Sequence, residues 1–312
     1  AERFVQVRTE PELHAALKLA REQAWPVTVL GGGSNVVLGR RLPGLVIRIG
    51  LSGMGFSEEG VVDSAAGESW HGLVLRSLQA GFSGLENLAL IPGSVGAAPI
   101  QNIGAYGVEL QAVFRRLWAI DRQSLEQVQL TGPECEFAYR ASVFKHRFRD
   151  RLVITRVELQ LSRELVPNLS HDELRAEVAA SGLPITTRLI ADTVCRIRRR
   201  KLPDPAVTAN VGSFFKNPVV SRARFELLRT QWPQMPHWDV DNGVKMPAAW
   251  LIDHSGERQA RVGGARLSTQ HALVMINQGN ADADDVLALA ARIRTAVEHR
   301  FNLSLEIEPI VY

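Results

Sequence analysis

The sequence predicts an α+β fold, and two observations lead to this prediction. Strand-like and helix-like segments mix along the chain without the strict alternation of a doubly wound sheet. The composition is that of a globular protein, with 46% hydrophobic and 22% charged residues. At 312 residues the chain is long enough for two or three domains, each with its own core.

In the first half, a helix and three short strands precede a second helix. Residues 9–12 read Thr-Glu-Pro-Glu, a capping box followed by apolar residues at helical spacing from 13 to 20. Trp25-Pro26 comes after the end of this helix. Strands are expected at 27–30, 45–49 and 61–66, and a helix over 70–80 that Gly81 closes.

In the second half, residues 151–161 alternate as a strand. Val153, Thr155, Val157 and Leu159 lie on one face, and Arg156, Glu158 and Gln160 lie on the other. Residues 201–205, which contain Pro203 and Pro205, are the best linker candidate. Helices are expected over 187–201, 221–231 and 282–301, and strands over 272–276 and 303–311.

Charge and cysteine content narrow the function classes. Cys135 and Cys195 lack partners at metal-ligand spacing, so we expect two free thiols and no metal. The net charge of +3 is mild, and the cluster 196–201 suits a phosphorylated small molecule better than nucleic acid. No apolar stretch reaches membrane-span length and no apolar signal region opens the chain, so we expect a cytoplasmic protein.

Two glycine-rich segments about sixty residues apart, 29–35 and 91–107, are the most informative feature. Their small residues allow backbone N–H groups to close on an anion, as at a dinucleotide-like cofactor. A Rossmann site is excluded because the third glycine position holds Val36 and no acidic residue occurs from Ser34 to Phe56. A P-loop is excluded because no Gly-Lys-Ser/Thr follows.

At this point the residues resemble a known family, UDP-N-acetylenolpyruvoylglucosamine reductase (MurB). The resemblance is carried by both glycine segments and by further motifs in the same order along nearly the whole chain. These motifs are Phe137-Ala-Tyr-Arg-Ala-Ser142, Lys201-Leu-Pro-Asp-Pro205, Gly212-Ser-Phe-Phe-Lys-Asn-Pro218, Ala248-Ala-Trp-Leu-Ile-Asp253 and Leu305-Glu-Ile-Glu308.

The resemblance implies a vanillyl-alcohol-oxidase-like FAD-binding fold of two subdomains plus a third α+β substrate-binding domain. The expected boundaries are 1–50 with the strand 303–312, then 51–202, then 203–302. FAD would be bound non-covalently. The implied cofactor contacts are Gly31, Gly32, Gly33, Ser34, Asn35, Pro92, Gly93, Ser94, Val95, Gly96, Ala97, Ala98, Asn102, Gly104, Tyr106, Gly107 and Ile154.

The resemblance also implies the chemistry: NADPH-dependent reduction of UDP-N-acetylglucosamine enolpyruvate to UDP-N-acetylmuramate, in peptidoglycan precursor synthesis. Hydride would pass from flavin N5 to C3, and a proton from Ser213 to C2. Arg140 would hold the substrate carboxylate, and Glu308 would aid polarisation or protonation of the intermediate. Without the resemblance, Arg140 would be read as a structural ion pair and Ser213 as a turn serine.

Substrate contacts follow in the same way. The matching positions are Tyr139, His171, Arg198, Lys201, Asn217 and Gln270 or His271. His171 stands where one branch of the family has a loop tyrosine that closes over the substrate, and imidazole can still stack or donate to phosphate, with pH sensitivity. We expect a monomer that binds neither nucleic acid nor membrane.

Two other functions fit parts of the sequence. A flavin oxidase or dehydrogenase of the same cofactor fold would share the glycine segments, but the intact motifs at 212–218 and 305–308 argue against it. A basic nucleotide- or nucleic-acid-binding module would rest on residues 196–201 alone.

Overall fold

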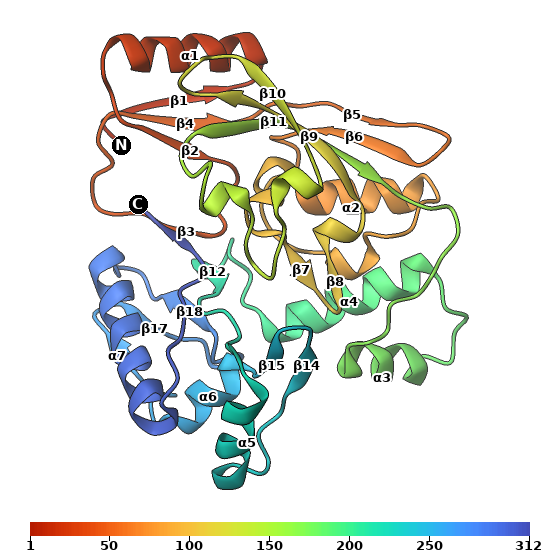
Figure 1. Cartoon of the computed structure of the whole chain (residues 1–312), viewed down its shortest axis with the longest axis vertical. Coiled ribbons are helices and arrows are strands. Elements are labelled where there is room, and N and C mark those ends of the chain that lie inside the picture. Colours follow the sequence, from red (N-terminus) through yellow and green to blue (C-terminus); the bar gives the residue numbers. More distant parts are fainter. The chain divides into compact units, whose positions relative to one another are not determined.

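The computed structural model describes residues 1–312, which form two compact units (Figure 1). Unit 1 contains residues 1–34 and 41–198, and unit 2 contains residues 35–40 and 199–312. Each unit has its own apolar core. Helices and strands mix in both units, which confirms the α+β class. The three-domain division with boundaries at 50 and 202 stays a prediction.

Unit 1 begins with a small parallel sheet. Its strand order is β1 (Arg3–Val7), β4 (Leu45–Ile49), β2 (Val27–Leu30), and helix α1 (Glu10–Glu22) covers one side (Figure 1). Thr9 is the N-cap of α1, as predicted, and its hydroxyl accepts the Glu12 N–H at 3.3 Å. The Glu12 carboxylate accepts the N–H of Arg8, one residue before the cap.

The larger sheet of unit 1 has five antiparallel strands. Their order is β10 (Gln127–Thr131), β9 (Phe114–Asp121), β11 (Leu152–Gln160), β6 (Val61–Ala65) and β5 (Met54–Phe56). The unit also contains α2 (Trp70–Gln79), the short pair β7 (Gly104–Ala105) and β8 (Val108–Glu109), α3 (Asp172–Ala180) and the first part of α4 (Thr187–Lys201). The helices predicted at 70–80 and 187–201 are therefore confirmed.

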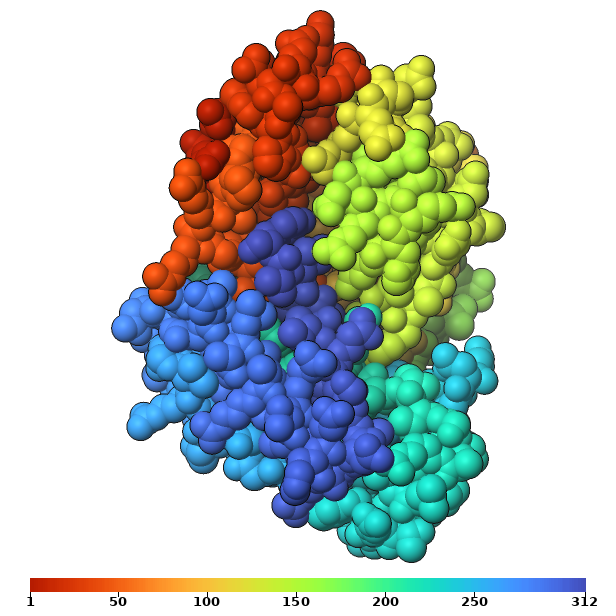
Figure 2. Space-filling view, turned by 60° about the vertical axis from the view of Figure 1, so that its left-hand side comes forward, coloured from red at the N-terminus to blue at the C-terminus, as the bar shows by residue number.

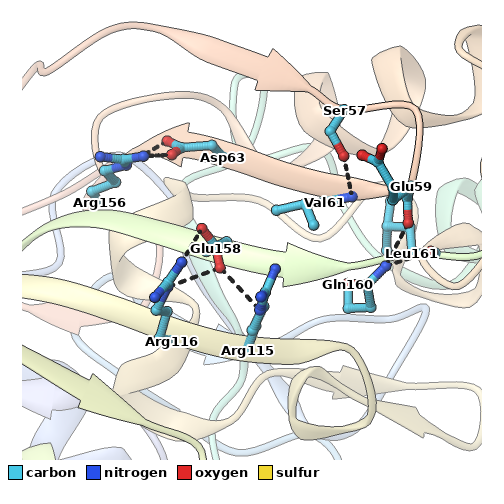
Figure 3. A network of polar contacts seen from close by, with 10 residues as sticks. All are labelled: Ser57, Glu59, Val61, Asp63, Arg115, Arg116, Arg156, Glu158, Gln160 and Leu161. Carbon is cyan, nitrogen blue, oxygen red and sulfur yellow. Dashed lines mark hydrogen bonds and ion pairs between the residues drawn. The ribbon is translucent and has the colours of Figure 1, made fainter.

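The polar face of β11 carries a network of arginines and carboxylates (Figure 3). Glu158 is buried although it lies on the face predicted to be polar. The Nε atoms of Arg116 and Arg115 lie 2.9 and 3.2 Å from its carboxylate. Arg156 pairs with Asp63 on β6, and the Arg156 guanidinium lies 4.3 Å from the Trp118 ring centroid. These cations compensate the charge that the strand buries.

A second buried carboxylate, Asp121 at the end of β9, accepts hydrogen bonds from Gln123 N–H and Arg151 Nε at 2.8 and 2.7 Å. Burial alone would raise its pKa, but these hydrogen bonds outweigh burial and hold the pKa below its usual value. We expect Asp121→Asn to lower the free energy of unfolding by about 2 kcal/mol at neutral pH. Chemical denaturation of the variant and of wild type measures this difference in the free energy of unfolding.

The expected pH dependence of this effect has a definite sign. Because the folded-state pKa of Asp121 is lowered, its contribution is fully present above the unfolded pKa of about 3.9 and is lost as pH falls through the folded pKa. Asp192→Asn is the control, since Asp192 forms only a surface pair with Arg188 on α4 and should change nothing measurable. Equal free energies of unfolding for Asp121→Asn and wild type at pH 7 would show that the hydrogen-bonded Asp121 carboxylate does not stabilise the fold.

Unit 2 contains two antiparallel sheets and one parallel pair. The first sheet has the order β12 (Asn210–Ser213), β18 (Val274–Asn277), β17 (Ala265–Leu267), β16 (Arg261–Val262). The second has the order β13 (Val219–Val220), β15 (Gly243–Lys245), β14 (Trp238–Val240), and β19 (Ile310–Val311) pairs with β3 (Val36–Val37). The helices are α5 (Arg222–Gln231), α6 (Ala248–His254) and α7 (Ala283–Phe301).

Helix α7 packs one face onto the first sheet of unit 2. Leu289, Ile293 and Val297 of α7 are buried in one apolar core with Leu267 and Met275 of the sheet. The opposite side of α7 is exposed and forms part of the surface seen in blue in Figure 2. The amphipathic helix predicted over 282–301 is therefore confirmed, with Asp282 as its N-cap.

The predicted strand 303–311 is wrong as a continuous strand. Only Ile310–Val311 forms one, and Ile307 makes an isolated bridge with Phe215. Pro309 separates the two because it has no N–H to donate to a ladder. The strand predicted at 272–276 begins instead at Val274, because the Val274 N–H closes a turn onto the His271 carbonyl.

Two further sequence expectations concern thiols and membranes. Cys135 and Cys195 are both buried and form no disulfide. Burial raises the pKa of the Cys135 thiol to about 12, so this thiol does not ionise at neutral pH. None of the helices is both long enough and apolar enough to cross a bilayer.

Candidate active site

The two glycine-rich segments lie directly against each other in unit 1. A Cβ atom on Gly32 would come within 3.0 Å of the Gly93 Cα, and one on Gly31 within 2.3 Å of the Ser94 Oγ. The Ser34 hydroxyl lies 3.2 Å from the Pro92 carbonyl oxygen. A side chain at position 32 would press on the Gly93 backbone, whereas one at position 31 would make the Ser94 hydroxyl turn away, so small residues favour this close approach.

The second glycine segment is anchored to the five-stranded sheet through Ala66. The Gly96 N–H donates to the Ala66 carbonyl, and the Ala66 N–H donates to the Thr155 carbonyl of β11, both at 2.9 Å. A Cβ on Gly96 would lie 2.5 Å from the Ala66 Cβ. Ile154, predicted to contact the cofactor, is the buried neighbour of Thr155 in this strand.

Arg140 projects from a tight turn onto the second glycine segment. Ala138 and Ala141 exchange two backbone hydrogen bonds of 3.1 Å, which leaves Tyr139 and Arg140 as the two turn residues, with Arg140 at φ +52°. The Arg140 Nη2 donates to the Gly104 carbonyl at 2.5 Å. A Cβ on Gly104 would lie 2.9 Å from the Arg140 Nη1 and 3.0 Å from the Val108 carbonyl oxygen, so this crowded position favours glycine.

Asn102 is fully buried and its side chain is used within the protein. Its Nδ2 donates to the Glu109 carboxylate and the Ala138 carbonyl at 2.8 and 3.2 Å, and its Oδ1 accepts the Gln111 N–H at 3.0 Å. The residue thus fixes the course of the glycine segment beside the Arg140 turn. Any contact between this side chain and a cofactor stays a prediction.

His171 contacts Tyr106, which belongs to the second glycine segment. Their ring centroids are 4.9 Å apart in an edge arrangement. His171 is also the N-cap of α3, where its Nδ1 accepts the Leu174 N–H at 3.4 Å. The loop before it is held by Asn168, whose Nδ2 donates to the Gly107 carbonyl at 3.1 Å, and a Cβ on Gly107 would strike the Ser170 Oγ.

Arg198 lies near the same tyrosine. It is half-buried, and its Nε donates to the Leu90 carbonyl at 3.2 Å. Burial lowers the pKa of the Arg198 guanidinium and the neighbouring Arg140 lowers it further, whereas Tyr106 raises it. Arg198 and Arg140 are two neighbouring cations, which make this part of unit 1 suited to an anion.

In unit 2 the main chain places Ser213 and Glu308 together. The Glu308 N–H donates to the Phe214 carbonyl at 2.9 Å, directly after Ser213, and the Lys216 N–H donates to the Glu306 carbonyl at the same distance. Glu308 is half-buried, whereas the Glu306 side chain is 70% exposed and pairs with Lys216. Gly212 has φ +71° and no heavy atom within 4 Å of an added Cβ, so the backbone before Ser213 is open to a ligand.

The other predicted residues of unit 2 lie around this pair or support it. Gln270 and His271 are in the loop between β17 and β18, and Ser213 pairs with Val274 at the start of β18. The Asn217 Oδ1 accepts the Ala248 N–H at the start of α6, so this amide has a structural contact. Lys201, a predicted substrate contact, is the last residue of α4. Asn35, a predicted cofactor contact, uses its backbone carbonyl to accept the Ile310 N–H.

Comparisons with known proteins show which family has this sequence. Residues 204–312 match the family model described as UDP-N-acetylenolpyruvoylglucosamine reductase, C-terminal domain, and residues 1–122 match an FAD binding domain. The UDP-N-acetylenolpyruvoylglucosamine reductase of Bordetella pertussis is 45% identical over 97% of this chain and 88% of its own length. The chain belongs to the UDP-N-acetylenolpyruvoylglucosamine reductase family.

Other members of the UDP-N-acetylenolpyruvoylglucosamine reductase family agree. The enzyme of Escherichia coli K12 is 43% identical over 99% of this chain and 90% of its own length. The crystal structure of the family member from Thermus caldophilus aligns with a TM-score of 0.69 and 28% identity, covering 99% of this chain and 91% of that one. The predicted family, its FAD-binding fold and its class, an FAD-containing oxidoreductase, are therefore confirmed.

The residues of unit 1 fit the FAD of the reductase family. Gly33 has φ +70° with no heavy atom within 4 Å of an added Cβ, so the loop has open space on that side. The backbone N–H groups of Gly32, Gly33 and Gly93 donate to no other backbone or side-chain atom. Adjacent free N–H groups on a loop without side chains form a concavity that suits a pyrophosphate. Residues 31–34 and 92–98 would hold it.

Sequence reasoning missed some supporting residues of this reductase. Ala66 supports Gly96, and Asn87 donates from one Nδ2 to the carbonyls of Tyr106 and Asn168 at 2.8 and 2.9 Å. Asn87 is buried, and its position in the mostly apolar stretch 85–90 was the available signal. Ala66 gave no signal, because a small residue at the end of a strand is common.

Proposed function

We propose that this chain reduces UDP-N-acetylglucosamine enolpyruvate to UDP-N-acetylmuramate with NADPH as the reductant, in peptidoglycan precursor synthesis. The observation that carries the proposal is the main-chain hydrogen bond from the Glu308 N–H to the Phe214 carbonyl, which brings the backbone of Glu308 beside that of Ser213 within the segment that matches the family's C-terminal domain. A hydroxyl that a carboxylic acid assists suits delivery of a proton to carbon.

Each residue has one role in the proposed reaction. When bound, FAD takes hydride equivalents from NADPH and supplies them to C3 of the enolpyruvyl group. Ser213 donates the proton that C2 then needs, and Glu308 assists because a serine hydroxyl alone is a weak acid. Arg140 holds the substrate carboxylate, with a planar fork that matches its two oxygens.

The substrate-binding roles of the remaining residues are part of the same proposal. Arg198 and Lys201 suit the diphosphate, and Tyr139 and His171 suit contacts to the sugar nucleotide. The contact between His171 and Tyr106 supports a position beside the second glycine segment. Asn217 and Gln270 or His271 complete the proposed set. A monomeric state and a cytoplasmic location belong to the proposal too.

Absorption spectroscopy tests the proposal. The purified protein should be yellow, should bleach on anaerobic addition of NADPH, and should regain its colour when UDP-N-acetylglucosamine enolpyruvate is added. Bleaching without recovery would reject this substrate while leaving the flavin site in place. A colourless protein that cannot be reconstituted with FAD would reject the cofactor assignment as well.

Glu308 and Glu306 form a matched pair for a sharper test. We expect Glu308→Gln to slow flavin reoxidation by the enolpyruvyl sugar about 10²-fold or more, because the neutral amide cannot assist proton transfer to C2. Glu306→Gln should leave that rate unchanged, since the Glu306 side chain is 70% exposed and pairs with Lys216. Rapid-mixing absorbance measures both rates. Equal flavin reoxidation rates in the two variants would show that Glu308 has no role in proton transfer.

A further inference from the structure

Glu109 lies beside Arg140, at the hairpin of β7 and β8. Gly104 of β7 and Glu109 of β8 are direct partners in the ladder, so the Glu109 side chain projects from the face on which Gly104 has none. A Cβ on Gly104 would lie 2.9 Å from the Arg140 Nη1 and 2.9 Å from the Glu109 Cγ. The guanidinium therefore lies over Gly104, next to the side chain of Glu109.

The Glu109 carboxylate also orients the amide of Asn102. Its Oε2 accepts hydrogen bonds from the Asn102 Nδ2 at 2.8 Å and from the Gln111 Nε2 at 3.0 Å. The Asn102 Oδ1 accepts the Gln111 N–H at 3.0 Å, so rotating the amide by half a turn would lose the contacts of both its ends. Hydrogen bonds to a carboxylate are stronger than those between neutral groups, and Asn102 is fully buried, so the amide has one orientation.

Asn102 connects Glu109 to the turn that contains Arg140. The Asn102 Nδ2 also donates to the Ala138 carbonyl at 3.2 Å, and this carbonyl is one of the two that close the turn. After the turn, the Ser142 hydroxyl donates to the Ile100 carbonyl at 2.6 Å. The turn is thus held on the second glycine segment from both sides of Arg140, whose φ of +52° persists only where the surroundings hold it.

We propose that Glu109 is a positioning residue for Arg140. Through Asn102 it holds the turn, and with its own side chain it limits the movement of the guanidinium over Gly104. The inference rests on the proposed function, in which Arg140 holds the substrate carboxylate. A planar fork has to match two carboxylate oxygens at once, so its contact depends on orientation as well as on charge. A displacement of about 1 Å can cost roughly 100-fold in rate.

Arg198 gives a physical reason why Arg140 needs this support. Burial lowers the pKa of the Arg198 guanidinium, and the positive charge of Arg140 lowers it further, so the two like charges are close enough to repel each other. The negative charge of Glu109 beside Arg140 offsets part of this repulsion. The hydrogen bonds of Asn102 keep the turn from moving away under what remains.

Hydrogen exchange measures the hold on the turn without any substrate. The N–H groups of Ala138 and Ala141 close the turn, so the exchange rate of the peptide that contains them, followed by mass spectrometry on the FAD-loaded protein, reports its opening. We expect Glu109→Ala to raise this rate about 10-fold, and Glu109→Gln, which keeps an acceptor for Asn102, to raise it less. Asp63→Asn removes another half-buried carboxylate, on β6, and should leave the rate unchanged.

Flavin reoxidation by the enolpyruvyl sugar shows whether the hold acts through Arg140. We expect Glu109→Ala to lower kcat/KM for reoxidation about 10- to 100-fold and to leave flavin reduction by NADPH unchanged. In an Arg140→Ala background the same substitution should have no further effect, because its effect depends on that arginine. An equal loss in both backgrounds would overturn the proposal, since Glu109 would then act on the reaction independently of Arg140.

The two measurements separate this inference from the proposed function. Unchanged hydrogen exchange of the turn in Glu109→Ala would overturn the inference whatever the substrate is. Faster exchange, in a protein whose wild type the enolpyruvyl sugar does not reoxidise, would reject that substrate and still support the hold of Glu109 on the Arg140 turn. Glu109→Gln preserves the shape of the side chain and answers the same questions if Glu109→Ala does not fold.

Discussion

Ser213→Ala is expected to slow flavin reoxidation by the enolpyruvyl sugar about 10²- to 10⁴-fold while leaving flavin reduction by NADPH unchanged. The hydroxyl is needed only when C2 receives its proton, and hydride transfer from NADPH needs no proton from the protein. The backbone that positions Ser213 in β12 does not depend on its side chain, since its pairing with Val274 is a main-chain contact. Anaerobic rapid mixing, followed at the flavin absorbance band, measures the two half-reactions separately.

A serine elsewhere in unit 2 gives the control for this experiment. The Ser255 hydroxyl donates to the Ile252 carbonyl at 2.8 Å at the end of α6, so Ser255→Ala should alter neither half-reaction. Equal slowing of both half-reactions by Ser213→Ala would show a structural role for the residue. An unchanged reoxidation rate would assign the proton to another group.

Gly33→Leu is expected to abolish FAD binding without unfolding the protein. Gly33 has φ +70°, which costs an L-residue roughly 1–2 kcal/mol, and its Cβ would point into open space, so the loop itself can accommodate the side chain. If that space receives the pyrophosphate, leucine occupies it. We expect purified Gly33→Leu to contain almost no flavin and to bind added FAD at least 100-fold more weakly, as measured by quenching of flavin fluorescence.

Gly182 supplies a closely matched control. It has φ +64° and, like Gly33, no heavy atom within 4 Å of an added Cβ, but it lies just after α3. Gly182→Leu should therefore carry the same backbone strain and keep its FAD. Gly96 is a poorer choice for this purpose, because a Cβ there would lie 2.5 Å from the Ala66 Cβ and would disturb the protein itself. Normal FAD affinity in Gly33→Leu would remove this loop from the cofactor site.

Local sequence patterns predicted the helices best. The amphipathic period of α7 and of α4, and the N-cap of α7, act within one segment, so 282–301 and 187–201 were predicted within one residue. Strands β9 and β10 were missed, because their stability comes from pairing with β11 and with each other rather than from local pattern. The C-terminal strand is shorter than predicted, because the alternating pattern of 303–311 continues across Pro309, where a strand ladder cannot.

The candidate site also has features that the sequence predicted and features that it did not. The small residues of the two glycine segments predicted an anion site of the kind that holds a dinucleotide-like cofactor, and the close approach of Gly32 to Gly93 shows that the two segments lie together. The roles of Ser213 and Glu308 came from the family resemblance and stay predictions. The position of Glu109 beside Arg140 was not predicted, because it depends on the register of β7 with β8, which cannot be read from either strand by itself.

The pairing of β19 with β3 has a consequence for synthesis of the chain on the ribosome. The carbonyls of Asn35 and Val37 accept the N–H groups of Ile310 and Tyr312, at 3.1 and 3.0 Å. Residues 35–37 therefore cannot form this pairing until residues about 270 positions later have been synthesised. At about 5–20 residues per second, that interval is roughly 15–50 s. During this time residues 36–37 form an unpaired edge that could join another chain. The edge is only two residues long and Arg40 and Arg41 follow closely, which limits such pairing in the nascent protein.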